Sequence, residues 1–469
     1  MSSENIPAEV AAADEAVAQG DTGKFKLILS ILRQFIGVKD MANVRFSLPA
    51  QLIEPIPNLE YWNYCDRPDY FVAMDESDDA LERMLAVLRW YLTKDLKLVH
   101  GKICKPYNSV LGEYFRCRWT STSVPLNPVT AKLLEGPAEP AATASKASRF
   151  KPSFGRRGTS TATLASVSAP PTRPVSPTGS TKSTNSGVAR DITAPLQKPI
   201  QTAFLCEQTS HHPPVSAYIY SCPEKQIEAV GMDQIAAKFT GTTIKVEPGE
   251  LNEGIFVKLK KRNEEYRCTH PTATICGFLR GTLYTTIQDS AVITCKQTGL
   301  RTIIIYKDEP WIGKPKFQIE GLIFRYNQDE DEDIVTCRDV PEEAIVAKIE
   351  GSWKGKYYIS SPKSAERHVL LDVTDLLPVT KTVPPMEQQQ INESRVVWDP
   401  VTKAILARDF VQATRNKTEI EDLQRTVAKE RAAKEEPFVP VYFQVNGDGR
   451  PTLTEAGRRT LLGQFDATS

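Results

Sequence analysis

The most constraining feature of this 469-residue chain is a succession of short segments, between residues 215 and 359, in which apolar and polar residues alternate. Gly, Pro, Asn and Asp separate the segments, which recur at intervals of roughly 10 residues. Alternation with a period of two places the apolar side chains on one face of a β-strand. Strands at this spacing are typical of an antiparallel barrel or sandwich, and they include VSAYIYS, TTIKVEP, GIFVKLK, LYTTI, AVITC, RTIIIY and KFQIEGLIF.

Helical patterns flank the predicted strands on both sides. Residues 25–36 have apolar residues at helical spacing and end at Gly37, which suits a helix C-terminus. Because Leu27 and Ile31 lie on its other side, this helix is apolar nearly all round. It must be buried, pressed on a membrane or covering an apolar opening. Its apolar stripe consists of Phe25, Ile28, Leu29, Leu32, Phe35 and Ile36.

A second helical pattern has the properties of a core helix. Apolar residues follow one stripe from Leu81 to Leu96, and Ser77 and Asp78 precede them as helix-start residues. A third helical pattern, strongly charged, follows Thr402 and continues through Lys434. The order of helix, many strands and helix predicts an α+β domain.

Composition divides the chain into four segments. Residues 1–23 are polar and Ala-rich, and we expect a disordered N-terminal tail. Residues 24–124 and 198–469 carry the helical and strand patterns of the folded domain. Between them, residues 125–197 are rich in Ser, Thr, Pro and Ala and almost free of large apolar residues. Such a segment cannot bury enough surface to offset its chain entropy, so we expect a disordered insertion.

Charge and cysteine content exclude several classes of protein. The 58 basic and 58 acidic residues balance, which argues against a dedicated nucleic-acid binder. The nine cysteines form no C-x-x-C pair, so we expect free thiols in a reducing cytosol rather than a disulfide framework or a zinc site. The N-terminal residues have no signal-peptide pattern, and no stretch approaches the ~18 apolar residues of a membrane span. We therefore expect any work on membranes to be done from the water side.

Two adjacent histidines, His211 and His212, lie in the segment CEQTSHHPPVSAY. Neighbouring side chains of a strand face opposite sides, so both rings can meet one ligand only where the strand bends. The following Pro213-Pro214 favours such a bend. A purely structural turn is the alternative. A hydrolase could use the adjacent Ser210, but no G-x-S-x-G elbow is present, and a metal site would lack well-spaced third and fourth ligands.

Two further segments carry candidate binding residues. KPYNSVLGEYF, from Lys105 to Phe115, places a cation before an Asn and an apolar turn, and a solvated Lys is the alternative. In NKTEIEDLQR, Lys417, Glu421 and Arg425 stand four residues apart and project from one helical face. Two cations with a carboxylate between them suit an anion that carries several phosphates. Spacing alone favours a surface ladder of ion pairs, each worth about 0.3–0.5 kcal/mol.

Taken together, these segments resemble the oxysterol-binding protein-related family. EQTSHHPP resembles the family's E-Q-x-S-H-H-P-P signature, and KPYNSVLGE is similar to its K-P-x-N-P-x-L-G-E element, with Ser109 in place of the usual Pro. GSWKGKYYI and NKTEIEDLQR follow in the family's order. The resemblance covers residues 24–445 apart from the insertion, and it implies a short member that has only the ligand-binding domain.

The resemblance implies an incomplete antiparallel β-barrel that encloses a lipid tunnel, with an N-terminal lid helix and flanking helices. The lid and its hinge would be formed by Phe25, Ile28, Leu32, Phe35, Asn43, Arg45 and Leu48. Leu52 and Ile53 would line the tunnel. The head group of phosphatidylinositol 4-phosphate would contact Lys105, Asn108, His211, His212, Lys417, Glu421 and Arg425.

The function that the resemblance implies is lipid transport without catalysis, cofactor or metal. The protein would exchange a sterol for phosphatidylinositol 4-phosphate between membranes, one lipid at a time. We expect a cytoplasmic monomer that touches membranes transiently as a peripheral protein, for example at contact sites of the endoplasmic reticulum, Golgi and plasma membrane.

Other functions stay open at the level of the sequence. Phosphatidylserine is the alternative second cargo, and the absence of an obvious serine-head-group site between the lid and the tunnel residues favours the sterol. Alternatives of another class are a lipid hydrolase or phosphatase that uses the histidine pair, and a lipid-regulated scaffold that uses the insertion for docking.

Overall fold

The computed structural model describes Arg33, Gly37, Val38 and residues 53–100, 105–125, 198–277, 283–310 and 314–466. The predicted tail at residues 1–23 and insertion residues 126–197 lie outside the described residues. So do the predicted lid, hinge and first tunnel residues Phe25, Ile28, Leu32, Phe35, Asn43, Arg45, Leu48 and Leu52. Gly37, the predicted end of the lid helix, has a φ of +89°, a left-handed conformation that glycine adopts readily.

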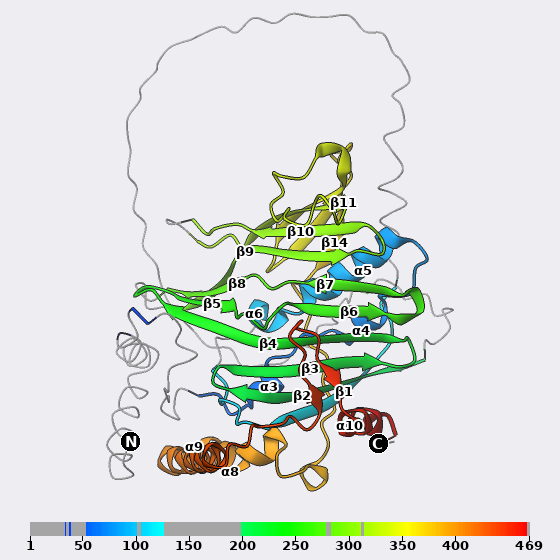
Figure 1. Cartoon of the computed structure of the whole chain (residues 1–469). Helices are drawn as coiled ribbons and strands as arrows, with labels where there is room; N and C mark the ends of the chain where they lie inside the picture. Colours follow the sequence, from blue (N-terminus) through cyan, green and yellow to red (C-terminus); the bar gives the residue numbers. More distant parts are fainter. Residues whose placement is uncertain are drawn as a thin grey trace, which may run out of the picture. The chain divides into compact units, whose positions relative to one another are not determined.

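One large antiparallel sheet makes up most of the described fold (Figure 1). Its strands pair in the order β1-β2-β3-β4-β5-β8-β9-β10-β11-β12-β13-β14, while β6 and β7 pair with the remaining halves of β4 and β9. The bounds are β1 Tyr114–Ser121, β2 Ile200–His211, β3 Pro214–Cys222, β4 Ile227–Phe239, β5 Ile244–Pro248, β6 Ile255–Leu259, β7 Glu264–Cys268, β8 Thr272–Cys276, β9 Tyr284–Cys295, β10 Leu300–Tyr306, β11 Gln318–Arg325, β12 Ile345–Ser352, β13 Lys356–Ser360 and β14 Arg367–Asp372.

Strands from the whole width of the sheet share one core, which shows that the sheet curls. Phe115 of β1, Tyr266 of β7 and Leu370 of β14 belong to a single cluster of buried residues. Leu85 of helix α5 (Ala80–Thr93) belongs to the same cluster. The strands of the main order, laid flat at the usual spacing of about 4.8 Å, would separate β1 from β14 by roughly 50 Å. Within the described residues β1 and β14 do not pair, so the sheet is an incomplete β-barrel.

Helix α5 is the core helix that the leucine pattern predicts. Leu81, Met84, Leu85, Leu88 and Leu92 are all buried. Leu96 is buried too, but it begins a separate short helix, α6 (Leu96–His100). Among the described residues, two other short helices precede α5, α3 (Asn58–Tyr61) and α4 (Pro68–Val72).

The start of α5 lies beyond the predicted Ser77 and Asp78. The N-cap residue is Asp79, whose carboxylate accepts a hydrogen bond from the Glu82 N–H at 2.8 Å. Asp79 and Glu82 have the spacing of a capping box, and Asp78 instead forms an exposed ion pair with Arg262. The N-cap of α5 is therefore the residue that stands three positions before Glu82, which is Asp79.

The predicted alternating segments are strands, with one correction. LYTTI and AVITC, predicted as two strands, are the two halves of β9. The polar residues between them do not end the strand, because Asp289 and Ser290 continue the pairing with β10. The two halves differ in their other neighbour, which is first β8 and then β7. The strands β1, β2 and β14 extend the sheet beyond the range that alternation predicts.

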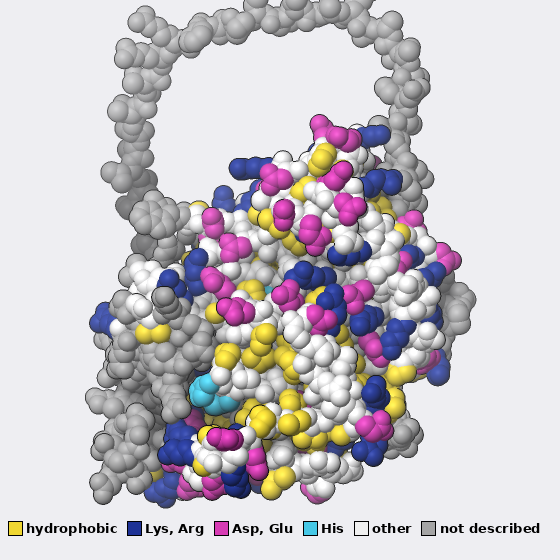
Figure 2. Space-filling model, in the orientation of Figure 1, with side chains coloured by type: hydrophobic (Ala, Val, Ile, Leu, Met, Phe, Trp, Pro, Cys, Tyr) yellow, Lys and Arg dark blue, Asp and Glu magenta, His cyan; other side chains and the backbone are white. Residues whose placement is uncertain are grey.

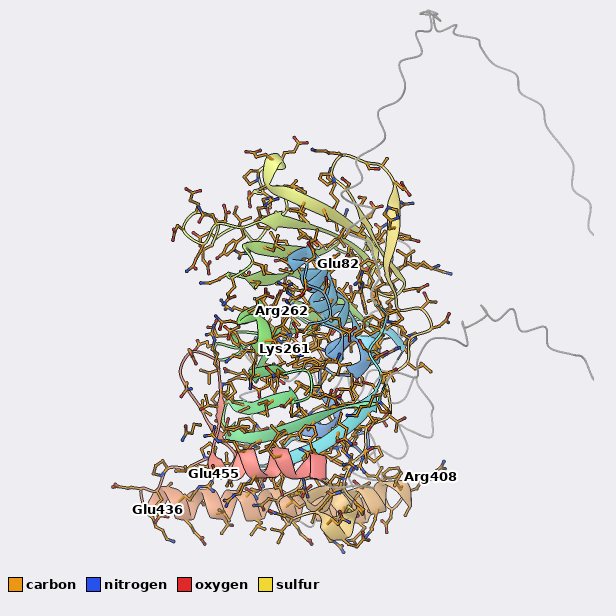
Figure 3. The ribbon with its side chains drawn as sticks, turned by 90° about the vertical axis from the view of Figure 1, so that its right-hand side faces the viewer. Glu82, Lys261, Arg262, Arg408, Glu436 and Glu455 are labelled. Carbon is orange, nitrogen blue, oxygen red and sulfur yellow. The ribbon has the colours of Figure 1, made fainter. Side chains whose placement is uncertain are left out.

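Three longer helices follow the sheet: α8 (Ser394–Leu406), α9 (Phe410–Ala433) and α10 (Glu455–Asp466). In Figure 3, α9 extends from near Arg408 to Glu436, and Glu455 marks the start of α10. The helical pattern was predicted only after Thr402, whereas α8 begins at Ser394. The earlier start is hidden in the sequence, because Pro400 lies inside the helix and a proline ordinarily indicates a helix boundary. Among the described residues, no helix is long and apolar enough to cross a membrane.

Smaller elements complete the described part of the chain. They are the strands β15 (Phe443–Gln444) and β16 (Thr452–Leu453), and the 3₁₀ turns η4 (Lys260–Arg262), η5 (Glu342–Ala344) and η6 (Met386–Gln388). The insertion falls in the connection between two neighbouring antiparallel strands, since Ser121 of β1 pairs with Ile200 of β2. Residues 122–199 therefore leave and re-enter the sheet at one place.

Candidate functional site

The two histidines lie at the tight turn between β2 and β3. β2 ends at His211, β3 begins at Pro214, and these two residues are paired. The register of β2 shifts between Gln208 and Ser210, and such a bulge re-aims the side chains that follow it. The ring centroids of His211 and His212 are 4.6 Å apart, so the two rings lie next to each other at this turn.

The loop from Lys105 to Glu113 is attached to the same strand. The Gly112 N–H donates to the Gln208 carbonyl at 3.0 Å, and the Gln208 N–H donates to the Glu113 carbonyl at 2.8 Å. Within the loop, the Lys105 ammonium donates to the Asn108 side-chain oxygen at 2.6 Å. These contacts fix the exposed Lys105 and Asn108 near the end of β2 that carries the histidines.

Glu113 anchors this loop to helix α8. Its carboxylate is fully buried and accepts hydrogen bonds from the Ser394 hydroxyl at 2.6 Å, the Trp398 indole N–H at 3.0 Å and the Val110 N–H at 2.9 Å. Burial raises the pKa of Glu113 to about 7, although these donors act in the opposite direction. The Tyr107 ring also stacks on Trp398, with centroids 4.7 Å apart.

Helix α9 carries the predicted ladder of charges. The Lys417 ammonium lies 2.9 Å from the Glu421 carboxylate, and Arg425 contacts both Glu421, at 3.4 Å, and Asp422. The exposed fraction of the side chain rises along the ladder, from 8% at Lys417 through 25% at Glu421 to 50% at Arg425. A purely surface ladder therefore describes only its Arg425 end.

These elements are connected to one another in space. The loop is bonded to β2 and to α8, and α9 packs on α8, where the Asn416 amide donates to the Pro400 carbonyl at 2.9 Å. Figure 2 shows histidine side chains exposed on one face, with Lys and Arg side chains grouped next to them where Figure 1 draws α9. Sequence segments more than 200 residues apart thus contribute to one region.

Ile53 is the one predicted tunnel residue within the described part of the chain. It is buried in a small cluster with Tyr107, Val110, Trp398 and Val401, beneath the loop, and not in the main core. Two recesses among the described residues have volumes of about 180 and 210 Å³. Both are too small for a lipid, and most residues predicted to line or close the tunnel lie outside the described part.

A partly buried polar cluster inside the barrel was not predicted from the sequence. The Tyr64 hydroxyl donates to the Asp233 carboxylate at 2.7 Å, and the His270 ring lies 5.0 Å from the Tyr64 ring. Burial raises the pKa of Asp233 to about 6 and lowers that of His270 to about 3. Among the described residues, the Tyr218 hydroxyl and His270 Nε2 have no hydrogen-bond partner. The available signal was the carboxylate of Asp233, which directly follows the apolar run AVGM of β4.

Glu207, which precedes the histidines in EQTSHHPP, has a different task. Its buried carboxylate accepts hydrogen bonds from three successive backbone N–H groups, those of Val441, Tyr442 and Phe443, at 2.7, 2.8 and 3.2 Å. It therefore fastens the segment that leads to β15 onto β2. The eight described cysteines are free thiols, and the described residues form no group of three or more potential metal ligands.

Comparison with known proteins gives consistent matches along the chain. The family model described as oxysterol-binding protein matches residues 27–457. Oxysterol-binding protein-like protein 1 of Schizosaccharomyces pombe is 43% identical over 476 residues, which cover 94% of this chain and 91% of that protein. Human oxysterol-binding protein-related protein 9 is 27% identical over 93% of this chain, and the match covers 49% of that protein.

Solved structures are similar in fold. The Osh1 ORD domain in complex with cholesterol has a TM-score of 0.58 at 16% identity, covering 93% of this chain and 88% of that one. The Osh3 ORD in complex with PI(4)P from Saccharomyces cerevisiae has a TM-score of 0.58 at 15% identity, covering 94% of both chains. The family match over most of the sequence and the shared fold agree: this chain belongs to the oxysterol-binding protein family.

Proposed function

We propose that the chain is a lipid transfer protein that exchanges a sterol for phosphatidylinositol 4-phosphate between membranes, carrying one lipid at a time. The observation that carries the proposal is the connection of the Lys105 loop, the His211–His212 turn and the charged face of α9. Two proteins of the same fold have been solved as complexes, the Osh1 ORD domain with cholesterol and the Osh3 ORD with PI(4)P, which supports both cargoes.

The head group would be held by the Lys105 loop, the His211–His212 turn and the charged face of α9. Phosphate oxygens accept charge-assisted hydrogen bonds from Lys105, Lys417 and Arg425, and from the histidines when they donate. Glu421 lies between the two cations of α9, where it orients them and can accept from inositol hydroxyls. These groups replace the water that the phosphates lose on leaving the membrane surface.

The apolar part of each lipid would be held inside the barrel. Keeping its surface from water is worth about 25 cal/mol per Å². The partly buried Asp233, Tyr64 and His270 offer acceptors and donors for the single hydroxyl of a sterol, whereas acyl chains have no such group. Since both lipids would occupy one interior, loading one excludes the other, and no covalent step is needed. We further propose that the chain acts as a monomer at the cytoplasmic face of membranes.

The test is extraction of phosphatidylinositol 4-phosphate from liposomes by the full chain. Replacing both His211 and His212 by Ala removes two head-group donors, and we expect at least tenfold weaker extraction. The matched control is His368→Ala, because His368 lies on β14, distant in the strand order from the β2–β3 turn. Unchanged extraction by the double variant would refute the head-group assignment.

The identity of the transported lipids is tested separately. Liposomes containing a fluorescent sterol, or phosphatidylserine, serve as the second donor, and mass analysis of the recovered lipids follows. Sterol uptake that competes with phosphatidylinositol 4-phosphate supports the exchange. Uptake of phosphatidylserine instead would replace the sterol as second cargo, and chemically altered lipid would indicate an enzyme.

A further inference from the structure

A cavity of about 210 Å³ lies between the two edges of the incomplete barrel. Val124 and Pro125, which follow β1, line one side, and Leu370 of β14 lines another. Tyr70 of α4 and Arg89 of α5 complete the wall from the helices. The cavity is smaller than the about 300–1,000 Å³ of pockets for drug-sized ligands, so its ligand must be small.

Arg89 is a buried cation without an ion-pair partner among the described residues. The residue is 7% exposed, and its Nε donates to the Leu370 carbonyl at 3.2 Å. That carbonyl is available because the register between β13 and β14 shifts at Leu370. The Nη2 atom is buried and has no hydrogen-bond partner within the described residues. The guanidinium nevertheless keeps its charge, since arginine does not deprotonate in proteins.

The other groups around the cavity leave this charge uncompensated. Arg89 is the only charged residue among those that line it, and Ala73 and Ala86 contribute apolar wall. Glu82, two helical turns earlier on α5, attracts Arg89 only through space. The Tyr70 hydroxyl makes no hydrogen bond within the described part of the chain, and burial raises its pKa, so it remains a donor.

A buried guanidinium with an unused N–H is costly unless an acceptor completes it. Carboxylates, which are planar, and phosphates, which are tetrahedral, are the acceptor groups whose oxygens match the guanidinium fork. We propose that this cavity binds a small oxyanion, a phosphate or a short carboxylate, through Arg89 and the Tyr70 hydroxyl. The site is separate from the proposed lipid site and does not depend on it.

Calorimetric titration of the full chain with inorganic phosphate, and separately with acetate, tests the proposal at constant ionic strength, with chloride as reference. Saturable binding of phosphate or acetate is expected. Arg89→Met should weaken it at least tenfold, because a charge-assisted contact is lost. The control is Arg262→Met, since Arg262 is a partly exposed cation already paired with Asp75 and Asp78, and the variant should bind as the natural chain does.

Phosphate could also bind at the histidine turn, so the double variant His211→Ala, His212→Ala is titrated in parallel. It should retain the binding that Arg89→Met loses, and the reverse result would overturn the proposal. A response to chloride equal to that of phosphate or acetate would overturn it as well.

A second variant keeps the test decisive if Arg89→Met does not fold. Ala86→Leu leaves the charge in place but fills the cavity, so it should abolish anion binding, and undiminished binding would refute the site. Extraction of phosphatidylinositol 4-phosphate, measured with the same variants, should be unchanged. Failure of the anion site and failure of the lipid site are thereby distinguishable.

Discussion

At the scale of single residues, the fold buries a carboxyl group where its ionised form is unfavourable. Glu113 is fully buried, and its hydrogen-bond donors do not offset the cost of desolvation, so its pKa rises to about 7 in the folded chain. An unfolded glutamate titrates near pH 4.3. The neutral form is therefore favoured by folding, and the contribution of Glu113 to stability is full below about pH 4, falls as the pH rises, and is lost above about pH 7.

The variant Glu113→Gln removes this titration. Its oxygen can accept from the Val110 and Trp398 N–H groups, and its amide can donate to Ser394, whose hydroxyl also lies 3.2 Å from the Tyr114 carbonyl. Relative to the natural chain, we expect the variant to gain roughly 2–3 kcal/mol of unfolding free energy between pH 5 and pH 8. Denaturant unfolding at both pH values measures this, and a constant difference between the two proteins would contradict the shifted pKa.

This role of Glu113 could not be predicted from the sequence. The segment KPYNSVLGE indicates a binding loop, but the partners Ser394 and Trp398 are 281 and 285 residues away, and only the folded chain brings them together. Arg89 was hidden for a related reason. It lies in an apolar helix, where a long side chain ordinarily reaches solvent, and nothing local indicates that it ends at a cavity.

At the scale of elements, helix α5 tests the corrected N-cap. Asp79→Ala removes the acceptor of the Glu82 N–H, and we expect a loss of about 1 kcal/mol of unfolding free energy. The control is Asp78→Ala, which removes only an exposed ion pair with Arg262 and should cost less than about 0.5 kcal/mol. Denaturant midpoints compare the two, and equal losses would argue against Asp79 as the cap.

Local pattern predicted the elements better than their arrangement. The stripe from Leu81 to Leu92 indicates a buried helix because periodicity is a local property, and the alternation in β3, β10 and β11 indicates strands for the same reason. The division of β4 and β9 between two sets of neighbours depends on where distant strands pair, so alternation could not reveal it. Helical spacing predicted that Lys417, Glu421 and Arg425 share one face of α9, whereas their assignment to a binding site came only from the family resemblance.

At the scale of the whole molecule, the insertion lies in the connection between β1 and β2, and the strand pairing of the sheet does not require it. β1 and β2 are adjacent, and residues 122–199 join Ser121 to its partner Ile200. Replacing residues 126–197 by a short Gly/Ser linker shortens this connection about eightfold, which lowers its closure cost by roughly 2 kcal/mol. We expect the shortened chain to fold and to extract phosphatidylinositol 4-phosphate as well as the natural one.

Liposome extraction and denaturant unfolding of the two chains check this expectation. A shortened chain that folds and extracts lipid but loses its activity in cells would favour the lipid-regulated scaffold. Loss of extraction itself, with folding intact, would mean that the insertion takes part in lipid handling.

The strand β2, which ends at His211, also binds the C-terminal segment of the chain. Substitutions in this strand therefore cause two different kinds of defect. Glu207 secures the backbone of residues 441–443, which lead through β15 and β16 to α10. Losing that carboxylate removes these three hydrogen bonds, whereas losing the imidazoles leaves them in place. A defect caused at Glu207 would therefore report a failure of assembly, whereas under the proposed function a defect caused at the histidines would report a failure to bind a lipid head group, although both substitutions fall in the same eight residues.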